Sequence, residues 1–129
     1  MHKGFLKTAF ILGALCVIMG AFGAHSIKDI VSQRVVVTFE TAVRYQFYHV
    51  FALLFAAILF KDFPNKLMIA AGWFFIAGII LFCGSLYMLC YVQATVQPGY
   101  KWLGPITPFG GVALIAGWLL MFFAVLKKK

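Results

Sequence analysis

The fold of this chain is decided by residues 67–92, which read LMIAAGWFFIAGIILFCGSLYMLCYV and contain no charged side chain. A helix of this length is about 39 Å long, which exceeds the roughly 30 Å of hydrocarbon in a bilayer. The run is continuously apolar rather than alternating, and a lone sheet cannot leave open edges in lipid. These residues therefore predict a transmembrane helix.

Three further apolar runs lead to the same prediction and give an all-α fold. The expected helices are residues 5–25, 38–60, 67–92 and 106–126. The second run is predominantly apolar only over 47–60, so its helix crosses the bilayer only if it includes the residues around Arg44. Short connections, one of them with Pro64 and Asn65, make consecutive helices antiparallel neighbours. We expect one domain over residues 1–129, an integral membrane bundle of four transmembrane helices.

The first run also has features of a signal peptide. Lys3 and Lys7 give it a basic start, and residues 21–23 (AFG) loosely resemble a small-residue cleavage site. Its apolar stretch is long for that role. We expect it to remain in place as the first transmembrane helix.

Composition argues against a soluble fold. The chain is 64% hydrophobic and 11% charged, whereas soluble domains carry about 25% charged residues. Its mean hydropathy is +1.01. The formal net charge of +8 would suggest nucleic acid in a soluble protein, but here the basic residues flank the apolar runs as membrane anchors do. We expect the lipid bilayer, and no nucleic acid, as a partner.

The distribution of Lys and Arg predicts the orientation of the bundle, because basic residues are enriched on the cytoplasmic side. One side holds both termini and seven basic residues: Lys3, Lys7, Lys61, Lys66, Lys127, Lys128 and Lys129. The other side holds four: Lys28, Arg34, Arg44 and Lys101. Both termini are therefore expected to be cytoplasmic.

Polar residues gather toward the outer half of the predicted bundle. A charge in the hydrocarbon centre costs about 2.5–3.5 kcal/mol, so these side chains should face the interior. Glu40 and Arg44 are four residues apart and can pair on one helix face. Three roles remain open: a latch between helices, a ligand or ion site, and a contact with a partner subunit. The predicted polar cluster, or candidate ligand site, comprises His25, Glu40, Arg44, Tyr45, Gln46, His49, Ser85, Tyr87 and Thr107.

Histidines and cysteines do not predict a metal or a cofactor. If the second helix enters the bilayer near Thr41, His49 lies about 12 Å deeper, whereas His25 lies at the boundary. That offset is poor for a shared haem. His2 is terminal and carries no predicted role. Three cysteines lie inside apolar runs without the spacing of a metal site, and we expect them to pack as small hydrophobes: Cys16, Cys83 and Cys90.

Small residues are expected to let the helices approach closely, because packing rather than the hydrophobic effect joins helices in lipid. The fourth helix is expected to start at Thr107 as the cap, with Pro108 in the first turn. The glycines assigned to helix packing are Gly13, Gly20, Gly23, Gly78, Gly84, Gly110 and Gly111.

Four segments, taken in order, resemble the domain-of-unknown-function 423 family, which includes bacterial inner-membrane proteins and the animal transmembrane protein 256. They are residues 20–25 (GAFGAH), 45–49 (YQFYH), 84–87 (GSLY) and 106–111 (ITPFGG). Cys83 stands where the family often has a serine. The resemblance covers essentially the whole chain. It implies four membrane helices in the bacterial inner (plasma) membrane, but no catalytic activity, substrate or cofactor.

The sequence favours a non-enzymatic function. It contains no nucleophile–base constellation and no phosphate loop, and no second carboxylate lies near His49 or Glu40 to share acid–base work. The leading hypothesis is a structural or accessory membrane subunit, in a homo-oligomer or a larger membrane complex. The alternative is a transporter or a binder of a small ligand or lipid headgroup, with Arg44 as the anion contact and His49 as a titrating group. That alternative requires an oligomer, because four helices are few for a carrier.

Overall fold

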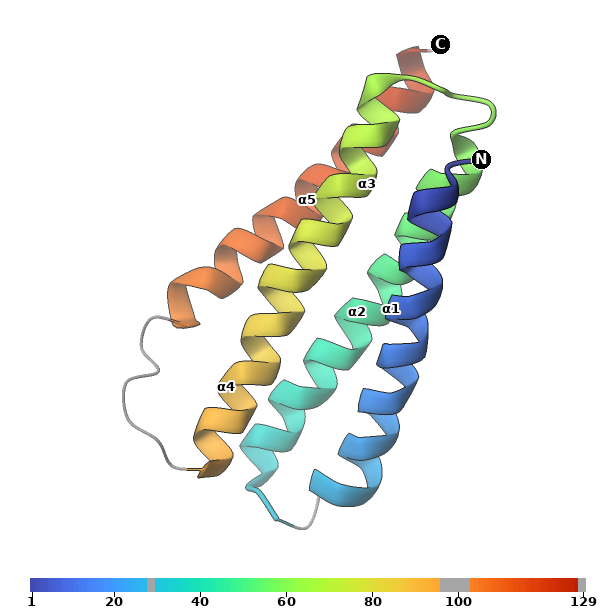
Figure 1. Ribbon diagram of the computed structural model, residues 1–129. Coiled ribbons are helices and arrows are strands. Elements are labelled where there is room, and N and C mark those ends of the chain that lie inside the picture. The colour runs from blue at the N-terminus through green and yellow to red at the C-terminus, as the bar shows by residue number, and fades with distance from the viewer. Residues whose placement is uncertain (28–29, 96–102, 128–129) are drawn as a thin grey trace.

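The chain folds into long helices in a computed structural model that describes residues 1–27, 30–95 and 103–127 (Figure 1). Helix α1 (Lys3–Phe22) continues into a π-helical turn, η1 (Gly23–Ile27), and α2 spans Gln33–Leu59. Next come α3 (Lys66–Gly78), the π-helical turn η2 (Ile79–Cys83) and α4 (Gly84–Thr95), which follow one another without a break; α5 spans Leu103–Lys127. Within the described residues, four helical stretches are long and apolar enough to cross a membrane: Lys3–Ser26, Gln33–Leu59, Lys66–Gln93 and Gly104–Lys127. The predicted fold class is confirmed.

Two helices begin earlier than expected. Helix α2 starts at Gln33, after Ser32 in an extended conformation, and α5 starts at Leu103. Thr107 is therefore not a cap, and Pro108 lies inside the helix, which corrects the predicted start. The reason is that Pro105 falls in the first turn, where backbone N–H groups have no acceptor within the helix.

The helices run antiparallel in two pairs. Helix α1 packs mainly on α2, and α3 packs mainly on α5, while α2 joins the pairs by contacting α3 and α4. Both termini lie at the same end of the bundle as the connection between α2 and α3 (Figure 1). Four basic residues used to predict the orientation lie outside the described residues: Lys28, Lys101, Lys128 and Lys129.

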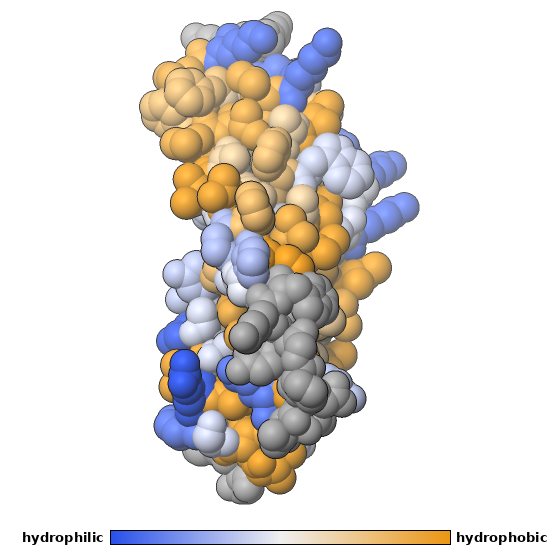
Figure 2. All heavy atoms as spheres, turned by 90° about the vertical axis from the view of Figure 1, so that its left-hand side faces the viewer, coloured by the Kyte–Doolittle hydropathy of each residue, from blue (hydrophilic) through white to orange (hydrophobic). Residues whose placement is uncertain are grey.

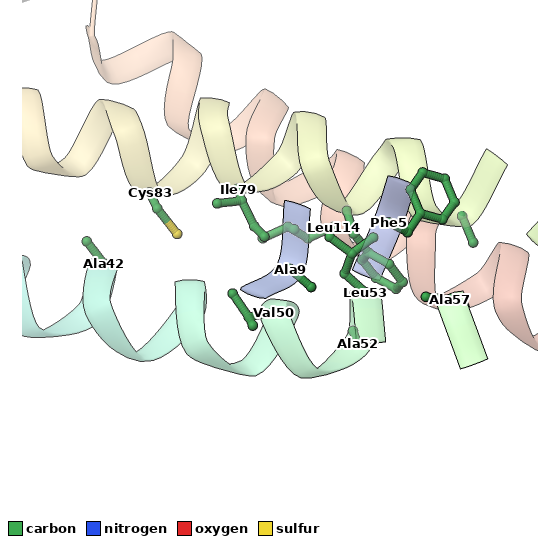
Figure 3. Close-up of a cluster of buried hydrophobic side chains, with 12 residues drawn as sticks. Phe5, Ala9, Ala42, Val50, Ala52, Leu53, Ala57, Ile79, Cys83 and Leu114 are labelled. Atoms are coloured by element: carbon green, nitrogen blue, oxygen red, sulfur yellow. The ribbon is translucent and has the colours of Figure 1, made fainter. Parts of the chain in front are cut away.

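Small residues alternate with large ones in the core between the pairs. The main buried cluster draws on Phe5 and Ala9 of α1, on Leu53 of α2 and on Leu114 of α5 (Figure 3), and it also includes Phe75 of α3. Phe5 fills the space above Gly72, where an added Cβ would overlap the phenyl ring. Close packing of this kind supplies the dispersion contacts that hold helices together in lipid.

The surface of the bundle is apolar, as a lipid environment requires. Phe10, Val17 and Ile115 each leave more than half of their surface exposed, at 62%, 65% and 61%. On the face shown in Figure 2, a hydrophobic band covers much of the upper half of the bundle, and hydrophilic residues lie at the top, along one side and in the lower half. In water such a belt would drive aggregation, whereas acyl chains can cover it.

Candidate functional site: polar side chains within the bundle

Gln46 connects three helices from a buried position on α2. Its exposed fraction is 4%. Its Nε2 donates to the backbone oxygen of Leu12 in α1 at 2.9 Å, and its Oε1 accepts from the Tyr87 hydroxyl of α4 at 2.7 Å. Both ends of the amide are therefore used, and the bonds tie α1 and α4 to α2. In hydrocarbon an unpaired amide would cost several kcal/mol, so these bonds also fix which way Gln46 points.

His49 lies one turn deeper and is also buried. The indole Nε1 of Trp118 in α5 donates to His49 Nε2 at 3.0 Å, and His49 Nδ1 lies 2.7 Å from the backbone oxygen of Tyr45. An indole N–H can only donate and a carbonyl can only accept. The ring must therefore carry its proton on Nδ1 and accept at Nε2. Neither nitrogen retains a lone pair for a metal or a substrate.

Ser85 joins α4 to α5 in the half of the bundle away from the termini. Its hydroxyl donates to the backbone oxygen of Phe82 at 2.9 Å and lies 2.6 Å from the Thr107 hydroxyl. Gly110 follows Thr107 by one turn, and an added Cβ there would overlap the backbone of Phe82 in η2. The hydroxyl pair thus stands beside the closest helix–helix approach of this region.

The other predicted members contribute no side chain to these bonds. His25, Glu40, Arg44 and Tyr45 are exposed, and no ion pair between Glu40 and Arg44 is present in the part of the chain that the structure describes. The guanidinium of Arg44 makes a long contact through Nη2 with Thr41 Oγ1, at 3.5 Å. The structure therefore corrects the prediction of a single interior cluster.

The helical repeat explains this division. Successive residues turn by about 100° around a helix, so the directions of Arg44 and Gln46 differ by about 160° and the two side chains cannot face the same side. The inward face of α2 carries Ala42, Gln46, His49 and Leu53. The outward face carries Glu40 and Arg44, then a strip of exposed aromatic side chains: Phe47, Tyr48, Phe51 and Phe55.

Arg44 lies in a surface groove between α1 and α2. One hollow, of about 230 Å³, is lined by Gly20, Gly23, Ala24, Phe39, Glu40, Val43 and Arg44. A second hollow, of about 350 Å³, adjoins it and is lined by Cys16, Val17, Gly20, Ala21, Val43, Arg44, Phe47 and Tyr48. The two share Gly20, Val43 and Arg44. We call the two hollows together the Arg44 groove.

A second groove lies between α1 and the rod of η2 and α4. Its volume is about 340 Å³, and Gln46 and Tyr87 contribute its few polar atoms. The remaining walls are apolar and come from Leu12, Leu15, Met19, Ile79, Ile80, Cys83 and Gly84. We call it the Gly84 groove.

Sequence reasoning missed three polar partners. Asn65 was read only as part of a turn, but it is buried, caps α3 by accepting from Met68 N at 3.0 Å, and donates to the Ala124 oxygen of α5 at 3.0 Å. Trp118, which donates to His49, is not among the predicted polar residues. His2 was considered uninformative, but its Nδ1 caps α1 by accepting from Phe5 N at 3.1 Å. An Asn just before an apolar run was the available signal for the cap at Asn65.

The glycines predicted to pack helices fall into two groups, according to the space around each one. Added Cβ atoms would crowd neighbours at Gly23, Gly78 and Gly110, but would make only ordinary contacts at Gly13, Gly20 and Gly111. At Gly84 nothing lies within 4 Å, so the structure corrects its assignment to packing within the bundle. Two close approaches were not predicted: Gly72 against Phe5, and Gly117 against Phe75.

These contacts limit what the interior can do chemically. Among the residues whose burial the structure describes, the buried polar ones are Gln46, His49, Asn65 and Ser85, and each bonds another part of the chain. The exception is Gln93 Oε1, a buried atom with no partner among the described residues. Over the same residues, no group of three or more His, Cys, Asp or Glu side chains could hold a metal ion.

Fold and site together define a class: a small multi-pass helical membrane protein whose interior polar side chains link its helices. Residues 19–111 match the family described as "Protein of unknown function (DUF423)". The chain is 37% identical to the UPF0382 membrane protein SH2409 of Staphylococcus haemolyticus, over 95% of this chain and 98% of that protein. It is 38% identical to the UPF0382 membrane protein YwdK of Bacillus subtilis, with the same coverage, and 31% identical to a UPF0382 membrane protein of Haemophilus influenzae over 100% and 98%.

The chain belongs to this family, as the four sequence segments predicted. It is a multi-pass protein of the bacterial inner membrane and its family has no established activity. No solved structure matches the chain significantly.

Proposed function

We propose that this chain is a non-enzymatic accessory subunit of the membrane, which acts through its outer surface and not through an interior reaction centre. The observation that carries the proposal is that Gln46, His49 and Ser85 are each bonded to another helix. Interhelical bonds of this kind are worth about 0.6 kcal/mol each in membrane proteins, and they fix the register of packed helices. Polar side chains that are hydrogen-bonded in this way stabilise the packing of the helices.

The Gly84 groove is the part of the surface best suited to a partner helix. Gly84 has no atom within 4 Å of its added Cβ, so its bare backbone remains open to close approach from outside. Ile80, one turn before it, is 62% exposed. Small residues beside exposed aliphatic ones favour helix association in lipid. The proposed occupant is a transmembrane helix of a partner subunit, from a second copy of this chain or from another membrane protein.

The Lys and Arg distribution supports an orientation with both termini in the cytoplasm. Among the described residues, the end with the termini carries Lys3, Lys7, Lys61, Lys66 and Lys127, while the opposite end carries Arg34 and Arg44. The positive-inside tendency favours the first end for the cytoplasm. Reporter fusions to each terminus test this proposal.

Mild extraction followed by native mass measurement tests the accessory role. We expect particles heavier than the 14.4 kDa single chain. Gly84→Leu should shift them toward the monomer, because the side chain would fill the Gly84 groove, while Gly20→Leu on the opposite groove should not. A monomer without partners, in every detergent tried, would contradict the proposal.

The transporter alternative receives less support from the geometry. It required Arg44 and His49 to act on one ligand, but they lie on different faces of α2, and both nitrogens of His49 are already bonded. Only Arg44 keeps the features expected of an anion contact.

A further inference from the structure

Two opposite charges share the Arg44 groove without neutralising one another. Glu40 and Arg44 are both exposed and both line the same hollow. In the described part of the chain no ion pair joins them, and the guanidinium makes only the long contact with Thr41. A ligand that carries both a negative and a positive group would complement this pair.

The groove is graded from polar to apolar along the helices. The hollow with Glu40 lies toward η1, at the end of the bundle opposite the termini. The adjoining hollow lies further along both helices, toward Cys16 and Tyr48, and among the described residues that line it Arg44 is the charged one. The charges therefore stand at one end of an otherwise apolar channel that is open to the lipid.

The side chain of Arg44 is long enough to reach the headgroup layer. It precedes Leu59 by fifteen residues, or about 22 Å along α2, and the hydrocarbon layer is about 30 Å thick. If Leu59 marks one edge, the Cα of Arg44 lies about 8 Å inside the other edge, and its long side chain can extend to the headgroups. Glu40 lies one turn, about 6 Å, closer to water. In a phospholipid the phosphate likewise lies below the headgroup amine.

We infer that the Arg44 groove binds a phospholipid with a primary amine, phosphatidylethanolamine. The guanidinium of Arg44 donates to the phosphate, the ammonium group donates to the carboxylate of Glu40, and one acyl chain follows the apolar hollow past Val17 and Phe47. Charge-assisted hydrogen bonds of both signs select this headgroup. A quaternary ammonium cannot donate to Glu40, and a headgroup without a cation leaves Glu40 facing a phosphate. This inference goes beyond the accessory role and requires no partner protein.

Native mass spectrometry of the purified full-length chain tests the inference, with phosphatidylethanolamine, phosphatidylcholine and phosphatidylglycerol of identical acyl chains. We expect phosphatidylethanolamine to bind about tenfold more tightly than the other two, which corresponds to one charge-assisted bond. Arg44→Gln should weaken its binding by about tenfold. Glu40→Gln should remove the preference for phosphatidylethanolamine over phosphatidylcholine.

Matched variants separate the groove from general charge effects. Arg34→Gln and Asp62→Asn remove the same charges at exposed positions outside the groove and should leave lipid binding unchanged. Gly20→Leu should block binding by filling the groove, while Gly84→Leu should leave it intact even where it dissociates an oligomer. That contrast separates lipid binding from the accessory role.

Equal binding of the three lipids would overturn the inference, as would an Arg44→Gln effect no larger than that of Arg34→Gln. Tightest binding of phosphatidylglycerol, increased further by Glu40→Gln, would assign the groove to anionic lipid held by Arg44 alone and would also overturn it.

Discussion

Replacing Gln46 by Leu tests whether the interior polar residues act as a latch. Leucine keeps a similar volume but removes the bonds to Leu12 and Tyr87. It also leaves the hydroxyl of Tyr87 inside the bundle without its acceptor. The Leu12 oxygen loses less, because it lies within α1, where backbone oxygens accept from the N–H four residues on.

The magnitude follows from these contacts. Two interhelical bonds at about 0.6 kcal/mol each give about 1.2 kcal/mol, and stranding the Tyr87 hydroxyl adds about 1 kcal/mol. Gln46→Leu should therefore destabilise the bundle by about 2 kcal/mol. Tyr87→Phe removes one bond and strands the Gln46 oxygen, which should cost about 1.6 kcal/mol. The double variant strands neither group and should cost about 1 kcal/mol, well below the sum of the single effects.

Equilibrium unfolding in mixed micelles with increasing dodecyl sulfate, followed by helical circular dichroism, measures these free energies. The double-mutant cycle should give a coupling of at least 1 kcal/mol between Gln46 and Tyr87. Additive effects, within the roughly 0.3–0.5 kcal/mol expected for independent sites, would refute the proposed bond and the latch with it.

Two further predictions concern helix packing. Gly110→Ala should destabilise the bundle by about 1–3 kcal/mol in the same unfolding assay, because the methyl group would displace α5 from the backbone of Phe82. Gly84→Ala, the control, should have little effect. Equal effects of the two substitutions would contradict the observed close approach of Gly110 to Phe82. Asn65→Ala should cost about 1–2 kcal/mol through loss of the α3 cap and the bond to Ala124, while Asn65→Asp should retain the cap and lose only the bond from Nδ2. An alanine variant as stable as the wild type would show that neither bond contributes.

The helices were predictable because a helix that crosses the hydrocarbon layer must be long and apolar, and residues 67–92 meet both conditions. The same sequence also contained the division of α2 into two faces. Ala42, Gln46, His49 and Leu53 recur at the three- and four-residue spacing of one face, and the exposed aromatic strip recurs at the same spacing on the other. The prediction placed every polar residue in the interior because a charge in lipid is costly. It did not consider that a long arginine side chain near the interface can extend to the polar layer.

Partners distant in sequence could not be predicted in this way. The bond between Trp118 and His49 depends on how α5 lies against α2, and Gly110 closely approaches the backbone of Phe82 in the π-helical turn η2. Neither the crossing of two helices nor a local π turn has a marker in the residues concerned. Asn65 differs, because its cap is local and its sequence signal was present.

The central claim is that the interior polar groups are hydrogen-bonded to other groups of the bundle and are not free to bind a ligand. The protonation state of His49 tests this claim most directly. Solid-state ¹⁵N spectra of the histidine-labelled chain in lipid bilayers, assigned with His49→Gln, distinguish the ring nitrogens. The structure predicts a protonated Nδ1 and an accepting Nε2 at neutral pH, with Trp118→Phe altering the Nε2 signal. An imidazolium ring, or a proton on Nε2 with Nδ1 unbound, would contradict the account and return His49 to the candidates for transport or ligand binding.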